Sequence, residues 1–169
     1  MSTDNFSGIA MGSAAVQIGI SENNAKATAT ILNNFVADEF LLYTKTRNYH
    51  WNVRGMEFGV LHKFFEDQYG QLEELVDEVA ERVRMLGHFA LGSLDQFLKI
   101  ARLTEGQEAT TAQNMIQNLL EDHETIIRLL REAIPVVSDK HKDLGNADFL
   151  TSLVEKHEKM AWMLRSHLG

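Results

Sequence analysis

Apolar side chains recur every three or four residues along most of this chain. In the first such stretch, the side chains that share one helical face are Leu32, Phe35, Val36, Glu39, Leu42, Tyr43, Thr46, Tyr49 and His50. This spacing matches an α-helix, which has about 3.6 residues per turn. Similar stripes follow, and the pattern predicts four long helices, over about residues 22–53, 58–86, 111–140 and from 146 almost to the C-terminus.

Capping signals mark where the predicted helices begin. Ser21 precedes the first helix and Asn146 is expected to cap the fourth, because such side chains accept hydrogen bonds from free N–H groups. Ser93-Leu94-Asp95-Gln96 has the spacing of a capping box and predicts a short helix between the second and third long helices. A four-helix bundle needs such a long connection when it crosses between parallel or diagonal helices.

Helix-breaking residues are scarce and lie where the pattern stops. Arg54-Gly55 ends the first helix and Gly87 ends the second. Pro135 is the single Pro in 169 residues and falls inside the third helix, so we expect a kink or an early end there. With only 11 Gly as well, the composition favours long helices over a turn-rich β protein. The predicted fold class is all-α, a four-helix bundle with a short extra helix in the crossover.

Length and composition indicate a single domain. A chain of 169 residues buries a core without disulfides, and the absence of Cys excludes thiolate ligands and Cys nucleophiles. Residues 1–20 are small and polar and are predicted to form a flexible N-terminal tail before a helical domain at 21–169. We find neither a secretory signal nor a run of about 18 apolar residues that would span a bilayer, and we expect a cytoplasmic protein.

The charge balance is acidic and narrows the range of partners. There are 24 Asp and Glu against 16 Lys and Arg, a formal net charge of −8 at pH 7. The first basic residue is Lys26, and no basic extension follows the last predicted helix. Unaided binding to nucleic acid or an anionic membrane requires positive charge. We therefore expect DNA binding to be weak or absent, and no membrane partner.

A conventional di-iron site within the bundle is not predicted. Such sites use Glu-x-x-His on inward helix faces. The residues three positions before the seven histidines are Arg47, Gly59, Met85, Leu120, Ser138, Val154 and Leu164, none of which is Glu. The motif His-Glu-x-x-His is absent too. Five histidines lack any comparable ligand set and are expected to be structural or exposed: His88, His123, His141, His157 and His167.

A different constellation lies on the second predicted helix. His62 and Glu66 are one turn apart, as are Asp77 and Glu81, and all four fall within about 100° of one helix face. Glu66 and Asp77 are about 16 Å apart along the axis, whereas the ligands of one metal ion lie about 2 Å from it. Either the two pairs are unrelated, or a two-fold symmetric dimer brings the first pair of one chain beside the second pair of its neighbour.

Both pairs also have a structural interpretation. In a chain with 24 acids, acidic pairs one turn apart occur by chance. Asp77 and Glu81 fit a solvated helix face near Arg82 and Arg84, and a single His62 is more often a packing or surface residue than a ligand. Spacing alone leaves both interpretations open.

Several segments resemble the Dps family, the miniferritins named as DNA-binding proteins from starved cells. The similarity runs from about residue 22 to 168, and its most specific part is a His-Trp-Asn-Val-Arg-Gly run followed by His and two acids. The matching segments are Asn48-Tyr49-His50-Trp51-Asn52-Val53-Arg54-Gly55, Leu61-His62-Lys63-Phe64-Phe65-Glu66, Asp77-Glu78-Val79-Ala80-Glu81-Arg82, Ala147-Asp148-Phe149-Leu150 and Lys159-Met160-Ala161-Trp162-Met163-Leu164. The resemblance implies a ferritin-like bundle and a hollow shell of twelve identical subunits that oxidises Fe(II) and stores ferric mineral.

The resemblance also implies a ligand set for iron. His50, His62 and Glu66 would come from one subunit, and Asp77 and Glu81 from its two-fold neighbour. Many relatives have Asp where this chain has Glu66, so the carboxylate here reaches about one methylene further. Asp67 is an alternative ligand, although it lies about 140° around the helix from His62 and is a poorer partner.

The resemblance further implies hydrogen peroxide as the preferred oxidant, with dioxygen as the other candidate. Carboxylates with neutral imidazoles accept Fe(II) and stabilise Fe(III), so iron loading is expected to weaken as pH falls through the imidazole range. Trp51 beside the site would either intercept stray oxidising equivalents or pack a dimer contact. Family members guide iron through acidic pores, and the candidates here are Asp139, Asp143 and Asp148, which also fit solvated loop charge.

Overall fold

The computed structural model describes residues 16–106 and 109–169. Its helices are α1 (Glu22–Asn52), α2 (Phe58–Met85), α3 (Leu94–Ile100), α4 (Ala112–Pro135), a π-helix η1 (Val136–Lys140) and α5 (Leu144–Ser166). No strand occurs in these two ranges. The predicted all-α class is confirmed, with the short extra helix in the crossover between α2 and α4.

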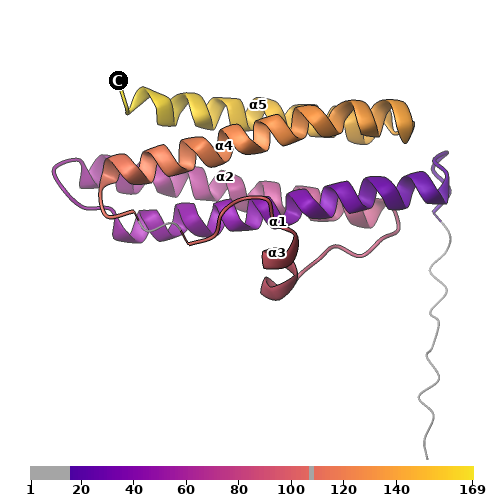
Figure 1. Cartoon of the computed structure of the whole chain (residues 1–169), viewed down its shortest axis with the longest axis horizontal. Coiled ribbons are helices and arrows are strands. Elements are labelled where there is room, and N and C mark those ends of the chain that lie inside the picture. The colour runs from indigo at the N-terminus through magenta and orange to yellow at the C-terminus, as the bar shows by residue number, and fades with distance from the viewer. Residues whose placement is uncertain (1–15, 107–108) are drawn as a thin grey trace, which may run out of the picture.

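The four long helices form a bundle of two helix pairs (Figure 1). The closest pairings are α1 with α2 and α4 with α5. The α3 helix lies outside the bundle against α1 (Figure 1), where Phe97 stacks on Phe40 with ring centroids 4.7 Å apart. The C-terminal end of α5 lies at the same end of the bundle as the turn between α1 and α2, and His167 contacts Phe64 there.

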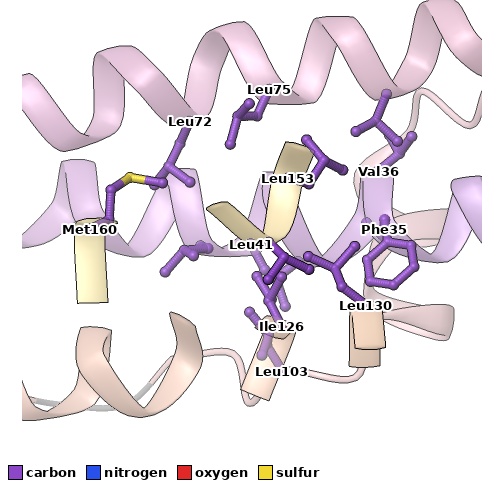
Figure 2. Packing of buried hydrophobic residues seen from close by; sticks show 14 of the residues in the cluster. Phe35, Val36, Leu41, Leu72, Leu75, Leu103, Ile126, Leu130, Leu153 and Met160 are labelled. Atoms are coloured by element: carbon purple, nitrogen blue, oxygen red, sulfur yellow. The ribbon is translucent and has the colours of Figure 1, made fainter. Parts of the chain in front are cut away.

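Apolar residues from α1, α2, α4 and α5 fill the interior (Figure 2). The residues with no exposed surface include Phe35, Leu72, Ile126, Leu130 and Leu153. Burying a side chain of this size contributes roughly 1.5–3 kcal/mol, so the apolar stripes read from the sequence supply most of the driving force for bundle formation.

Side-chain caps start the helices, with one correction to the sequence-based prediction. The predicted cap Ser21 accepts a hydrogen bond from the Asn24 N–H at 3.3 Å. Asn146, however, does not cap α5. The cap is Asp143, whose Oδ1 accepts from the Asn146 N–H at 3.0 Å. Asp143 is favoured as the cap because its carboxylate also accepts a 2.6 Å hydrogen bond from the Asn146 side chain. Both residues are buried.

Pro135 ends α4, as its position in the sequence predicts. The chain then continues as η1 rather than breaking, and the His141 N–H bonds the Val136 carbonyl. Proline has no N–H and its ring displaces the preceding turn, so the wider π-helical hydrogen-bond pattern follows from its presence.

Residues 16–20 lie beside the end of α2, near Leu86, Gly87 and His88. The rest of the predicted tail, residues 1–15, lies outside the described residues. No helix in the described ranges is long and apolar enough to cross a bilayer.

Candidate metal centre

His50 and His62 face each other across the turn between α1 and α2. The two helices pack antiparallel, which brings the end of one beside the start of the other. The imidazole rings stack with centroids 3.8 Å apart and an interplanar angle of 22°. Each ring bonds the other residue's backbone: the Nδ1 atom of His50 lies 2.8 Å from the His62 carbonyl oxygen, and the Nδ1 atom of His62 lies 2.8 Å from the His50 carbonyl oxygen.

This reciprocal pairing fixes the tautomer of both rings. A carbonyl oxygen only accepts hydrogen bonds, so each Nδ1 atom carries the proton and donates. In the neutral imidazole the Nε2 atom then holds the lone pair. Metal-binding histidines characteristically donate their second nitrogen to a carbonyl or carboxylate in this way. His50 and His62 are therefore oriented as two nitrogen ligands.

Glu66 follows His62 by one helical turn and is half-exposed. The Lys63 Nζ atom donates to Glu66 Oε2 at 2.9 Å and also lies 2.9 Å from Asp67 Oδ1. The hydrogen bond and charge of Lys63 lower the pKa of Glu66, and the nearby His50 acts in the same direction. Glu66 is thus an ionised carboxylate within electrostatic reach of the histidine pair. Lys63 occupies that carboxylate and also binds the alternative ligand Asp67.

Asp77 and Glu81 are exposed on the outer face of α2 and form no ion pair within the described ranges. Arg82 bonds the Asn146 side chain and Arg84 bonds the His88 carbonyl oxygen, so neither neutralises these acids. Asp77 is fifteen residues beyond His62, about 22 Å along the axis. Across 16–106 and 109–169, no three His, Asp or Glu residues of a single chain are grouped to hold a metal ion. The chain brings the two histidines into contact, places Glu66 one turn from His62, and leaves Asp77 and Glu81 apart.

An aromatic cluster adjoins the histidine pair. Tyr69 meets the His50 ring edge-on with centroids 5.2 Å apart. The Arg47 guanidinium lies 5.0 Å above the Tyr69 ring and 5.7 Å from the rings of both Tyr43 and Trp51. The Trp51 side chain is 65% exposed in the single chain. Any packing role of this indole therefore belongs to a contact with another molecule.

Spacing-based reasoning missed a buried polar cluster at the middle of the bundle. Glu39, His123 and His157 come from α1, α4 and α5, and none has exposed surface. His157 Nε2 lies 2.8 Å from Glu39 Oε1, and its Nδ1 lies 2.9 Å from His123 Nδ1. The one available signal is that Glu39 falls on the apolar face of its helix. A motif search within one helix does not detect residues that meet from three helices.

The three acids proposed to line a pore differ in their exposure to solvent. Asp139 and Asp148 are exposed, in keeping with either a pore or a solvated role. Asp143 is only 3% exposed and is the cap of α5, so the prediction that it lines a pore is wrong. Its position at a helix start explains why an acid is needed there.

The fold has clear counterparts among known proteins. The family described as the ferritin-like domain matches residues 29–169. The structure also superposes on that of a Dps protein from Vibrio cholerae with a TM-score of 0.86 and 28% identity, covering 93% of this chain and 99% of the other. That Dps protein is a member of the broad superfamily of ferritin-like diiron-carboxylate proteins. These matches and the bundle define the class as ferritin-like proteins.

Sequence relatives narrow the class. A low temperature-induced protein of Nostoc is 43% identical over 90% of this chain and 86% of its own length. DNA protection during starvation protein 2 of Bacillus anthracis is 32% identical over 85% of this chain and 98% of its own. The chain belongs to the Dps family of ferritin-like proteins. Membership supports, in general terms, iron storage, stress protection and assembly into a homo-oligomer.

Proposed function

We propose that this chain is a ferroxidase and iron-storage protein. Fe(II) is its substrate and binds at centres shared between two subunits. His50, His62 and Glu66 of one subunit hold the ion from one side. Asp77 and Glu81 of the two-fold neighbour complete the ligand set.

The reciprocal bonding of His50 and His62 is the observation that carries this proposal. Two imidazoles locked with their Nε2 lone pairs free, beside an ionised Glu66, form half of a nitrogen–oxygen ligand set suited to Fe(II). Such a half-site within one chain has too few ligands to retain an ion. Asp77 and Glu81, exposed and without an ion pair in the described chain, supply the missing carboxylates if a second copy packs antiparallel along α2.

The redox step balances with hydrogen peroxide as the oxidant. Two Fe(II) ions each give one electron, and one peroxide molecule takes up both electrons and two protons to become two molecules of water. Peroxide consumed in this way does not release hydroxyl radical, which accounts for a protective role under stress. Dioxygen is the other candidate oxidant.

The proposed assembly is a hollow shell of twelve subunits that stores the ferric product as mineral. The cytoplasmic location expected from the sequence is part of the same proposal. The net charge of −8 disfavours a nucleoid-binding function as the alternative. Residues 1–25 contain no Lys or Arg and add no positive charge that would attract DNA phosphates.

A subunit-mixing experiment tests whether the centre is shared. His62→Ala and Asp77→Ala variants are each expected to lose rapid Fe(II) oxidation while keeping their oligomeric state. When the two are unfolded together and reassembled, every mixed two-fold pair contains one intact centre of two. With random pairing, the mixture should recover about a quarter of the wild-type rate. The rate is followed by the absorbance of the ferric product.

The controls separate ligand loss from general damage. His167→Ala, which changes an exposed His, should leave the rate unchanged. The double variant carrying His62→Ala and Asp77→Ala in one chain should stay inactive after mixing with itself. Rapid oxidation that persists in the double variant, or no recovery in the mixture of single variants, would remove the proposed shared centre. Glu66→Ala compared with Asp67→Ala identifies which carboxylate is the ligand.

A further inference from the structure

Glu39, His157 and His123 form a hydrogen-bonded chain through the core of the bundle. The contacts run from Glu39 Oε1 to His157 Nε2 at 2.8 Å, and from His157 Nδ1 to His123 Nδ1 at 2.9 Å. All three side chains are completely buried. Burying three ionisable groups is costly, so the contacts between them must offset the lost hydration.

The chain of bonds crosses the boundary between the two helix pairs. Glu39 lies on α1 of the α1–α2 pair, and both histidines lie on the α4–α5 pair. Other buried polar contacts across this boundary join Lys45 Nζ to Asp122 Oδ2 at 2.6 Å and Gln68 Nε2 to the Met160 carbonyl oxygen at 3.3 Å. The apolar interface between the two helix pairs thus contains a few buried polar contacts.

The donor atoms lie in series and do not converge on a common point. His157 uses one ring nitrogen toward Glu39 and the other toward His123, so its ring separates the two partners. The arrangement is a route for protons and not a preformed metal cage, in agreement with the absence of a three-ligand group in the described part of the chain.

The two contacts hold two protons. One lies between Glu39 and His157, and one lies between the facing Nδ1 atoms, because two N–H groups cannot point at each other at 2.9 Å. A third proton leaves His123 Nε2 as a donor. That atom is buried and has no hydrogen-bond partner among the described residues. An additional proton therefore creates a buried donor without an acceptor.

We propose that the Glu39–His157–His123 chain is an acid-sensitive lock on the docking of α4 and α5 against α1 and α2. With two protons both contacts are made and join the helix pairs, while Glu39 Oε2 and His123 Nε2 stay buried without a partner among the described residues. On acidification a further proton binds His123 Nε2. The state in which the two helix pairs are docked then loses stability relative to the state in which they are separated.

The charged groups around the lock act in the opposite direction. Burial raises the pKa of Asp122, which pairs with Lys45, and of Asp38, which precedes Glu39 and pairs with Arg102. An acid with a raised pKa binds its proton more readily when folded, so acidification favours the folded state through both groups. Burial lowers the pKa of His123 well below its ordinary value, with the neighbouring His157 adding to the effect. His123 thus binds its proton more readily when unfolded, and acidification disfavours the folded state through this residue.

His123→Asn tests the lock, because its amide keeps an N–H donor near the Nδ1 position and does not titrate. The full-length, metal-free protein is unfolded in urea at one fixed protein concentration, at pH 7 and pH 5. One histidine excluded from protonation lowers the wild-type folding equilibrium constant by up to about 25-fold over this interval. In His123→Asn, the folding equilibrium constant should not show this fall between pH 7 and pH 5. His88→Asn, which changes a half-buried histidine outside the lock, should show the same fall as the wild type.

Two further readouts decide the outcome. In folded wild-type protein, the His123 ring should remain neutral down to pH 5 by histidine-labelled NMR, a measurement that does not depend on any variant. Titration of this ring near pH 6.5 without loss of stability would overturn the proposal, as would an unchanged pH dependence in His123→Asn. A Zn²⁺-induced gain in stability that His123→Asn abolishes would assign the cluster to metal binding instead.

Discussion

At the scale of single residues, the contact between Lys63 and Glu66 should affect how tightly the site binds metal. Lys63 Nζ lies 2.9 Å from both Glu66 Oε2 and Asp67 Oδ1, so an internal cation occupies the carboxylate proposed to bind iron. Metal and Lys63 therefore compete for Glu66. The pair is substantially exposed, so the competition is weak and of the order of 1 kcal/mol or less.

Removal of this competitor should strengthen metal binding. We expect Lys63→Ala to raise the affinity of the assembled protein for Fe(II) by about two- to fivefold, as measured by anaerobic titration. Lys99→Ala is the matched control, because Lys99 also pairs with an acid one turn away, Asp95, but on α3. Equal affinity in the two variants would show that Lys63 does not compete with the metal.

The residue types of the site could be predicted from sequence, whereas its geometry could not. Spacing along α2 places Glu66 one turn from His62 and marks Asp77 and Glu81 as a separate pair. The bonds between His50 and His62 depend on the register in which α1 packs on α2, and no pattern within one helix contains that register. The same limit explains why the buried cluster escaped detection.

At the scale of the helices, the sequence predicts a helix end to within a residue or two where a capping residue or a proline sets that end. Ser21 and Pro135 act through their own backbone and nearest turns, and both mark helix boundaries as expected. The start of α5 shows the limit of this reasoning. Asp143 and Asn146 are both good capping residues, and the choice between them depends on burial, which the sequence does not reveal.

The α5 cap gives a prediction at this scale. Asp143→Ala removes the acceptor of two hydrogen bonds from Asn146 in a buried position. We expect a loss of about 1–2 kcal/mol in the free energy of unfolding, measured by urea denaturation. Ser21→Ala removes a longer and exposed cap bond of 3.3 Å and should cost less. Equal losses in the two variants would mean that burial adds nothing to the α5 cap.

At the scale of the whole molecule, the net charge opposes DNA binding. Each chain carries a formal −8, so a shell of twelve chains would carry twelve times that charge, about −96. Such a field attracts Fe(II) and repels phosphate. We expect no stoichiometric duplex binding by the metal-free protein in a gel shift at about 0.15 M salt. A stoichiometric shift under these conditions would reveal a basic surface that the net charge conceals.

Gly70 lies where two α2 helices would approach each other in the proposed assembly. If residues 62–66 of one α2 face residues 77–81 of an antiparallel copy, the two-fold axis crosses the helix at about residue 71. Gly70 lies beside that point, about 80° around the helix from His62, and lines a shallow depression together with Asp77. A Cβ added to Gly70 would meet no described atom within 4 Å. The chain itself gives no reason for a mid-helix Gly, whereas close approach of a second helix does.

Gly70→Leu therefore separates folding from assembly. Leu favours the helix by about 0.8 kcal/mol over Gly, so the subunit should keep its helical content. The larger side chain would hold two α2 helices apart, and we expect smaller species in sedimentation velocity and an Fe(II) oxidation rate as low as that of the variant lacking His62 and Asp77. Glu132→Leu adds the same side chain at an exposed position on α4 and should leave both properties unchanged. A Gly70→Leu protein that assembles and oxidises iron normally would contradict a close approach of two antiparallel α2 helices at Gly70.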